Sequence, residues 1–202
     1  MSFFQTDLTK EKILSIYLDK MYTKLNLNFD RVINLELQHK GVDLIFHARD
    51  KDYFIDEKSQ LHYINSDLPT FTFELSYLKN KVEKTGWFLD NKMITTHYFL
   101  ITGIYAVDKK DLNKGFKKCK ITSVNKRKLK QHLTSIGLTD KKLLEYNKNI
   151  RLGKESKKIE IDELDLKKEG AFFYSPQYSE KPINLQLRLD FLINNKIAKR
   201  II

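Results

Sequence analysis

The sequence of 202 residues is long enough for one domain, or for one domain with a small lobe, with a hydrophobic core of its own. Hydrophobic residues make up 41% of the chain and aromatic residues 12%, which excludes a disordered protein. The single cysteine, Cys119, excludes a disulfide within the chain and argues against a thiolate zinc site, so a reducing, cytoplasmic location is expected. The N-terminal segment lacks the features of a signal peptide, and no run reaches about 18 apolar residues, so no membrane partner is expected.

The net charge of +11 is concentrated in one segment of the chain. Residues 109–158 contain 17 Lys or Arg against 4 Asp or Glu, whereas the remaining residues contain 20 against 22. A localised basic segment is typical of proteins that bind the phosphate backbone of nucleic acid. A solvated lysine-rich surface with no partner is the alternative.

The first half of the chain predicts one helix followed by strands. Residues 9–25 show helical apolar spacing, with Thr9 as the expected N-cap. Residues 29–37 are a candidate strand. Two β-rich arms, residues 41–48 and 53–60, flank the polar turn Asp50-Lys51-Asp52 and predict a β-hairpin.

The second half begins with two further strands, at residues 70–78 and 94–107, the latter with a bend expected at Gly103. A basic strand at 116–124 and two basic helices follow, the first capped by Ser123 or Asn125 and the second by Thr139. The predicted organisation is therefore a core over residues 1–108, a small basic helical lobe over 109–158, and a C-terminal segment, 159–202, that returns to the core.

Two carboxylates and one lysine of the predicted hairpin form a candidate site. Asp43 lies in one arm, and Asp56 and Lys58 lie in the other. Residues i and i+2 of a strand share a face, so Asp56 and Lys58 project together and Glu57 projects away from them. Mg²⁺ is commonly held by one or two carboxylates, with substrate phosphates and water as the other ligands. This pattern predicts a divalent-metal site with a cation beside it.

The spacing Asp43…Asp56-Glu57-Lys58, after an N-terminal helix, resembles the PD-(D/E)xK nuclease superfamily, which has the restriction-endonuclease-like fold. The resemblance covers roughly the first half of the chain, and Val42 stands where that motif has proline. It implies an α/β fold with a mixed central sheet flanked by helices, and catalytic roles for Asp43, Asp56, Lys58 and Gln60. It further implies Mg²⁺ or Mn²⁺ held by Asp43 and Asp56, DNA rather than RNA as the substrate, and a homodimer as one expected assembly.

Other interpretations of these residues remain open. The charged triplet also suits a solvated surface hairpin, and the chain also suits a non-catalytic nucleic-acid-binding or protein-interaction protein that keeps the fold. Glu36, Gln38 and Glu74 are further polar candidates for the site, each equally suited to a surface strand. For contact with nucleic acid, the candidates are four cations of the first basic helix: Lys126, Arg127, Lys128 and Lys130.

Overall fold

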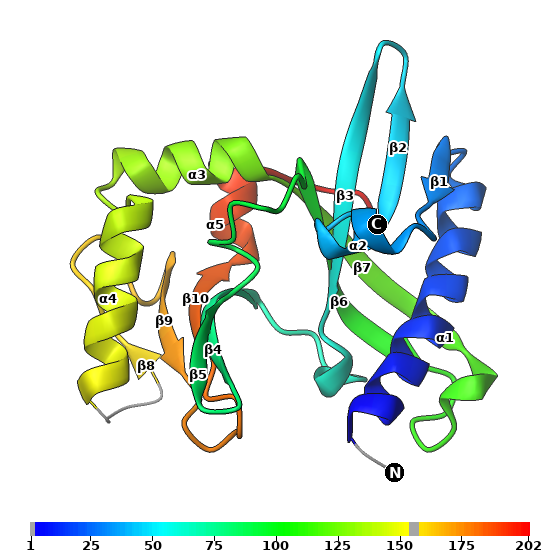
Figure 1. The fold of residues 1–202 in the computed structure, drawn as a ribbon. Coiled ribbons are helices and arrows are strands. Elements are labelled where there is room, and N and C mark those ends of the chain that lie inside the picture. Colours follow the sequence, from blue (N-terminus) through cyan, green and yellow to red (C-terminus); the bar gives the residue numbers. More distant parts are fainter. Residues whose placement is uncertain (1–2, 154–157) are drawn as a thin grey trace. The chain divides into compact units, whose positions relative to one another are not determined.

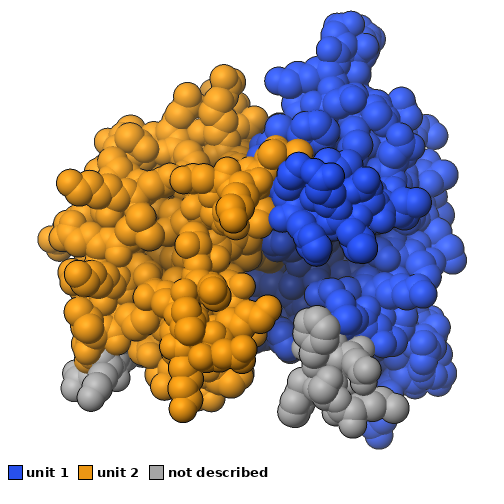
Figure 2. Space-filling view, viewed as in Figure 1, with its two compact units in different colours: residues 1–68, 95–123, 200–202 blue, residues 69–94, 124–199 orange. Residues whose placement is uncertain are grey.

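The computed structural model describes residues 3–153 and 158–202, and the chain divides into two compact units (Figure 2). Unit 1 comprises residues 1–68, 95–123 and 200–202, and unit 2 comprises residues 69–94 and 124–199. This division differs from the predicted boundaries at residues 108 and 158. The predicted ranges also include residues 1–2 and 154–157, which lie outside the described part. The predicted boundaries follow the distribution of charged residues. Charged residues lie mainly on the surface, so their distribution does not show which segments pack together into one unit.

Unit 1 is built on a six-stranded mixed sheet whose strands lie in the order β1-β2-β3-β6-β7-β11 (Figure 1). The hairpin strands β2 and β3 pair antiparallel, whereas β3 and β6 pair parallel. The strands are β1 (Phe29–Arg31), β2 (Leu44–Ala48), β3 (Lys51–Ser59), β6 (His97–Ala106), β7 (Phe116–Asn125) and β11 (Ala198–Arg200). The helical elements are α1 (Phe3–Lys24), α2 (Leu35–His39) and two 3-10 turns, η1 (Leu61–Tyr63) and η2 (Leu112–Lys114).

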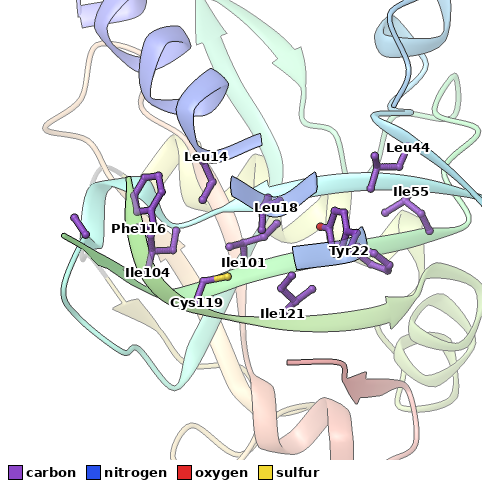
Figure 3. Close-up of a cluster of buried hydrophobic side chains, with 12 residues drawn as sticks. Leu14, Leu18, Tyr22, Leu44, Ile55, Ile101, Ile104, Phe116, Cys119 and Ile121 are labelled. Atoms are coloured by element: carbon purple, nitrogen blue, oxygen red, sulfur yellow. The ribbon is translucent and has the colours of Figure 1, made fainter. Parts of the chain in front are cut away.

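The core of unit 1 lies between α1 and one face of this sheet. Leu14, Leu18 and Tyr22, spaced four residues apart along α1, are at most 3% exposed (Figure 3). They belong to one cluster with the buried strand residues Leu44, Ile55, Phe99, Ile101, Ile104, Ala106, Phe116, Cys119 and Ile121. Strand residues of this cluster point towards α1. Their neighbours in each strand therefore point to the opposite side of the sheet.

Unit 2 contains a second sheet, of five strands in the order β5-β4-β10-β9-β8, and its described pairings are all antiparallel. Its strands are β4 (Thr70–Lys79), β5 (Val82–Thr85), β8 (Lys158–Ile159), β9 (Gly170–Tyr174) and β10 (Ile183–Arg188), and its helices are α3 (Lys126–Ser135), α4 (Asp140–Gly153) and α5 (Leu189–Asn194). Helix α4 contacts β4 and β10, and α5 contacts β10. The two basic helices are thus part of a unit with its own sheet, which differs from the small helical lobe that the sequence predicts.

The mixed α/β class, the hairpin and the capping of α3 by Asn125 were predicted correctly; the Asn125 side chain accepts a hydrogen bond from the Lys128 N–H at 2.9 Å. Two segments differ. Helix α1 begins at Phe3, so Thr9 lies inside the helix and is not its N-cap. The predicted strand at 29–37 ends after three residues, because the Asn34 side chain accepts from the Leu37 N–H at 3.1 Å and caps α2 instead.

None of the helices that the structure describes is both long and apolar enough to cross a membrane.

Candidate active site

The hairpin brings Asp43 next to Asp56. Asp43 immediately precedes β2, and its backbone N–H donates to the Ile55 carbonyl at 2.8 Å. The Asp43 Oδ2 atom accepts from the Glu57 N–H at 2.7 Å. Backbone contacts on both sides of Asp56 therefore fix the Asp43 carboxylate beside that residue, as the motif spacing predicts.

Asp56 is a buried acid with one cation beside it. The residue is 2% exposed, and the Lys58 Nζ atom lies 2.5 Å from its Oδ1 atom. Burial raises the pKa of Asp56 to about 7, Asp43 adds to this through its charge and a hydrogen bond, and Lys58 acts in the opposite direction. The buried Asp56 carboxylate thus has a second carboxylate and one ammonium group beside it, and a pair of neighbouring acids is an environment that favours a further cation.

Glu57 projects to the other face of β3, towards α1, as strand alternation predicts. The Tyr22 hydroxyl donates to its Oε1 atom at 2.6 Å, and Arg31 forms an ion pair with its Oε2 atom. Arg31 also pairs with Asp19 of α1. Burial raises the pKa of Glu57, and Arg31 opposes that rise. This acid therefore has structural partners that the sequence did not reveal, because Arg31 and Asp19 are separated from it by 26 and 38 positions in the chain.

Tyr98 is a neighbour of Asp56 that sequence reasoning did not single out as a site residue. The parallel register of β3 and β6 places Tyr98 beside Asp56 and Leu100 beside Lys58. Tyr98 is fully buried, and burial together with the charge of Asp56 raises its pKa, so the phenol stays neutral. The sequence signal was a tyrosine within an apolar strand, which by itself looks like an ordinary core residue.

Gln60 lies just past the end of β3, where its backbone N–H donates to the Ile101 carbonyl at 3.0 Å. Its helper role stays a prediction.

The other polar candidates of unit 1 have partners away from the two acids. Glu36 forms an exposed ion pair with Lys40 at 2.6 Å, and the Gln38 side chain donates to the Val32 carbonyl at 2.9 Å. Glu74 belongs to β4 of unit 2. Within unit 1, the structure therefore groups Asp43, Asp56 and Lys58 and leaves Glu36 and Gln38 to local structure.

Three of the four basic residues predicted to bind nucleic acid make contacts within unit 2. The Lys126 and Lys128 Nζ atoms donate to the carbonyls of Met93 at 3.0 Å and Lys196 at 3.2 Å. Lys130 pairs with Asp140 at 2.6 Å, and its Nζ atom lies 4.2 Å from the centre of the Phe88 ring. The fourth, Arg127, is exposed. The structure thus gives Lys126, Lys128 and Lys130 packing roles in addition to any role in binding.

The donor set of the site is small. Across residues 3–153 and 158–202, no three His, Cys, Asp or Glu side chains are grouped so as to hold a metal ion. Asp43 and Asp56 provide two carboxylates, which fits a hard cation such as Mg²⁺ that completes its shell with water and substrate oxygens. Comparison of the chain with protein-family models, with curated proteins and with solved structures returned no match.

Proposed function

We propose that this chain is a metal-dependent nuclease that hydrolyses phosphodiester bonds, with DNA preferred to RNA. The observation that carries the proposal is the convergence of Asp43, Asp56 and Lys58 on one sheet face, with a buried carboxylate whose pKa is raised to about 7. A buried acid whose pKa is perturbed by desolvation and by a specific charged neighbour is a candidate functional residue. The order of α1, the acid before β2 and the Asp-x-Lys of β3 supports the resemblance to PD-(D/E)xK nucleases.

Each residue of the site has a distinct expected role. Asp43 and Asp56 would hold Mg²⁺ or Mn²⁺, which when bound lowers the pKa of water and neutralises phosphate charge. The Lys58 ammonium, held by Asp56 and partly exposed, stabilises negative charge that develops on the phosphate oxygens. Glu57 contributes only through the fold, because it faces α1.

The test is cleavage of plasmid, linear duplex, single-stranded DNA and RNA with Mg²⁺ or Mn²⁺. Wild type should cut at least one substrate, and Asp43→Asn and Asp56→Asn should each reduce the rate by at least a hundredfold. Isothermal titration with Mn²⁺ separates the roles: both Asp variants should lose binding, whereas Lys58→Ala should keep it and lose cleavage.

Glu36→Gln is the matched control, because Glu36 is an exposed acid of the same unit that pairs only locally with Lys40. It should cut and bind Mn²⁺ as wild type does. If the wild-type chain cuts none of the four substrates, or if Asp56→Asn cuts at the wild-type rate, the nuclease proposal fails and a non-catalytic binding protein takes its place.

A further inference from the structure

A glycine in β6 reverses which side chains face α1. Before it, Phe99 and Ile101 belong to the core under α1, as alternation requires; after it, Ile104 and Ala106 belong to the same core. The break occurs at Gly103, whose φ of +52° is a left-handed conformation. A Cβ atom at this position would lie 2.9 Å from Asp67 Oδ1, so a side chain here would also displace the Asp67 carboxylate. As a result Tyr105 lies on the face opposite α1, the face that carries Asp56.

Strand β7 adds two lysines to that face. Cys119 and Ile121 belong to the core under α1, so Lys118 and Lys120 project to the other side. The Lys118 Nζ atom lies 4.5 Å from the centre of the Tyr105 ring, which confirms that these two side chains share a face. Lys118 and Lys120 are exposed and Tyr105 is half-buried, so all three can reach a ligand.

We propose that Tyr105, Lys118 and Lys120 bind a single strand of nucleic acid on the sheet face that also carries Asp56 and Lys58. Phosphates contact the two lysines, and a base packs against the tyrosine ring. Proteins that bind single strands without sequence preference combine cations that follow the backbone with aromatic rings on which bases stack. The proposal rests on the proposed function in one respect only, namely that the substrate is a nucleic acid.

The binding residues and the acids lie at separate places along the sheet, because Leu100 and Thr102, which lie between them on this face of β6, are fully buried. Leu100, the register partner of Lys58, lies five positions before Tyr105 in β6. At about 3.3 Å per residue this corresponds to roughly 16 Å, a length that spans several phosphates of one strand. Because all of these residues lie in one sheet of unit 1, the fold itself sets this separation.

Asp67 opposes binding on this face. It forms an ion pair with Lys120, and the two side chains are 37% and 47% exposed. An exposed pair of this kind holds its partners weakly, so a phosphate can displace the carboxylate. Removing the Asp67 charge should therefore strengthen binding, whereas removing the Lys118 charge or the Tyr105 ring should weaken it.

The experiment is fluorescence anisotropy of a 5′-labelled single-stranded DNA oligonucleotide in metal-free buffer, measured over a range of salt concentrations. Lys118→Gln should lower the slope of log K against log salt by about 0.7, the value for one phosphate contact on a single strand. Tyr105→Leu should weaken binding about tenfold with the slope unchanged, and Asp67→Asn should tighten it. Lys12→Gln and Lys20→Gln remove exposed lysines of α1, on the opposite face, and serve as matched controls.

The outcomes separate this proposal from the nuclease proposal. If the chain cleaves nucleic acid but Lys118→Gln, Tyr105→Leu and Asp67→Asn bind as wild type does, the binding surface is refuted and the nuclease proposal stands. If the three variants shift binding as expected but no substrate is cut, the surface stands and the nuclease proposal fails. Equal losses in the α1 controls would show that only net charge matters and would also refute the surface. Because Asp67→Asn is expected to improve binding, misfolding cannot produce its result.

Discussion

Replacing Asp56 with asparagine should stabilise the metal-free protein while abolishing its activity. The folded protein raises the pKa of this carboxyl from 3.8 to about 7. The folded state therefore binds the proton more tightly than the unfolded chain does, and stability falls as the pH rises from about 4 to about 7. An asparagine stays neutral at every pH, so the variant avoids this loss.

The structure sets the size of the effect. The difference between 3.8 and about 7 corresponds to an upper bound of about 4 kcal/mol, at about 1.4 kcal/mol per pKa unit. At pH 8 the Asp56→Asn variant should therefore gain up to about 4 kcal/mol in its free energy of unfolding, and at pH 5 only about 2 kcal/mol. The gain should be largest where wild-type Asp56 is ionised.

The assay is urea denaturation followed by circular dichroism, in chelator, at both pH values. The control is Asp50→Asn in the exposed turn of the β2–β3 hairpin, which should change stability by no more than about 0.5 kcal/mol. An Asp56→Asn variant that is no more stable than wild type at pH 8, or whose gain is the same at both pH values, would refute the argument that Asp56 is ionised at a cost to folding.

Three further changes test the framework around the site. Glu57→Ala leaves Arg31 without its buried partner, so urea denaturation should show a free energy of unfolding lower by about 3 kcal/mol. The cleavage rate per folded molecule should stay unchanged. A reduced rate would show that Glu57 takes part in catalysis. Gly103→Ala puts a side chain at positive φ and against Asp67, and the same assay should show a loss of about 1–3 kcal/mol. A neutral result would contradict the left-handed backbone conformation at this glycine. A hydrogen bond to Asp52, and to a smaller extent one to Asp30, raises the pKa of His47. His47→Gln should therefore lower the melting temperature at pH 6 and have little effect at pH 9, where the wild-type histidine is neutral and its stabilisation is already lost. An equal effect at both pH values would contradict the ion pairs.

The local parts of the site could be predicted from the sequence. Strand alternation separates Glu57 from Asp56 and Lys58, and the short turn after Ala48 makes a hairpin that brings Asp43 to Asp56. Both inferences need only neighbouring residues. The side chains from distant segments could not be found in this way, because Tyr98 reaches Asp56 only through a parallel pairing across about forty residues of chain.

Charge patterning gave a less complete picture of the surface. The basic residues of 109–158 are spread over several elements, among them strand β7 and helices α3 and α4, whose environments differ. Lys126 and Lys130 use their charges in local contacts, whereas Lys118 lies over an aromatic ring on the face that carries Asp56. Sequence alone does not distinguish these cases, because the face on which Tyr105 lies depends on the left-handed backbone conformation of Gly103.

The chain passes between its two units four times, and this interleaving restricts how the protein can be dissected. The backbone of Ile121 in β7 is paired with Ile201 and Ile202, so unit 1 draws part of its sheet from residues that follow unit 2 in the sequence. A fragment that ends near residue 123 lacks these partners, and one that begins near residue 124 lacks β4 and β5. Neither unit can therefore be expressed as one continuous piece of the chain that contains only its own residues.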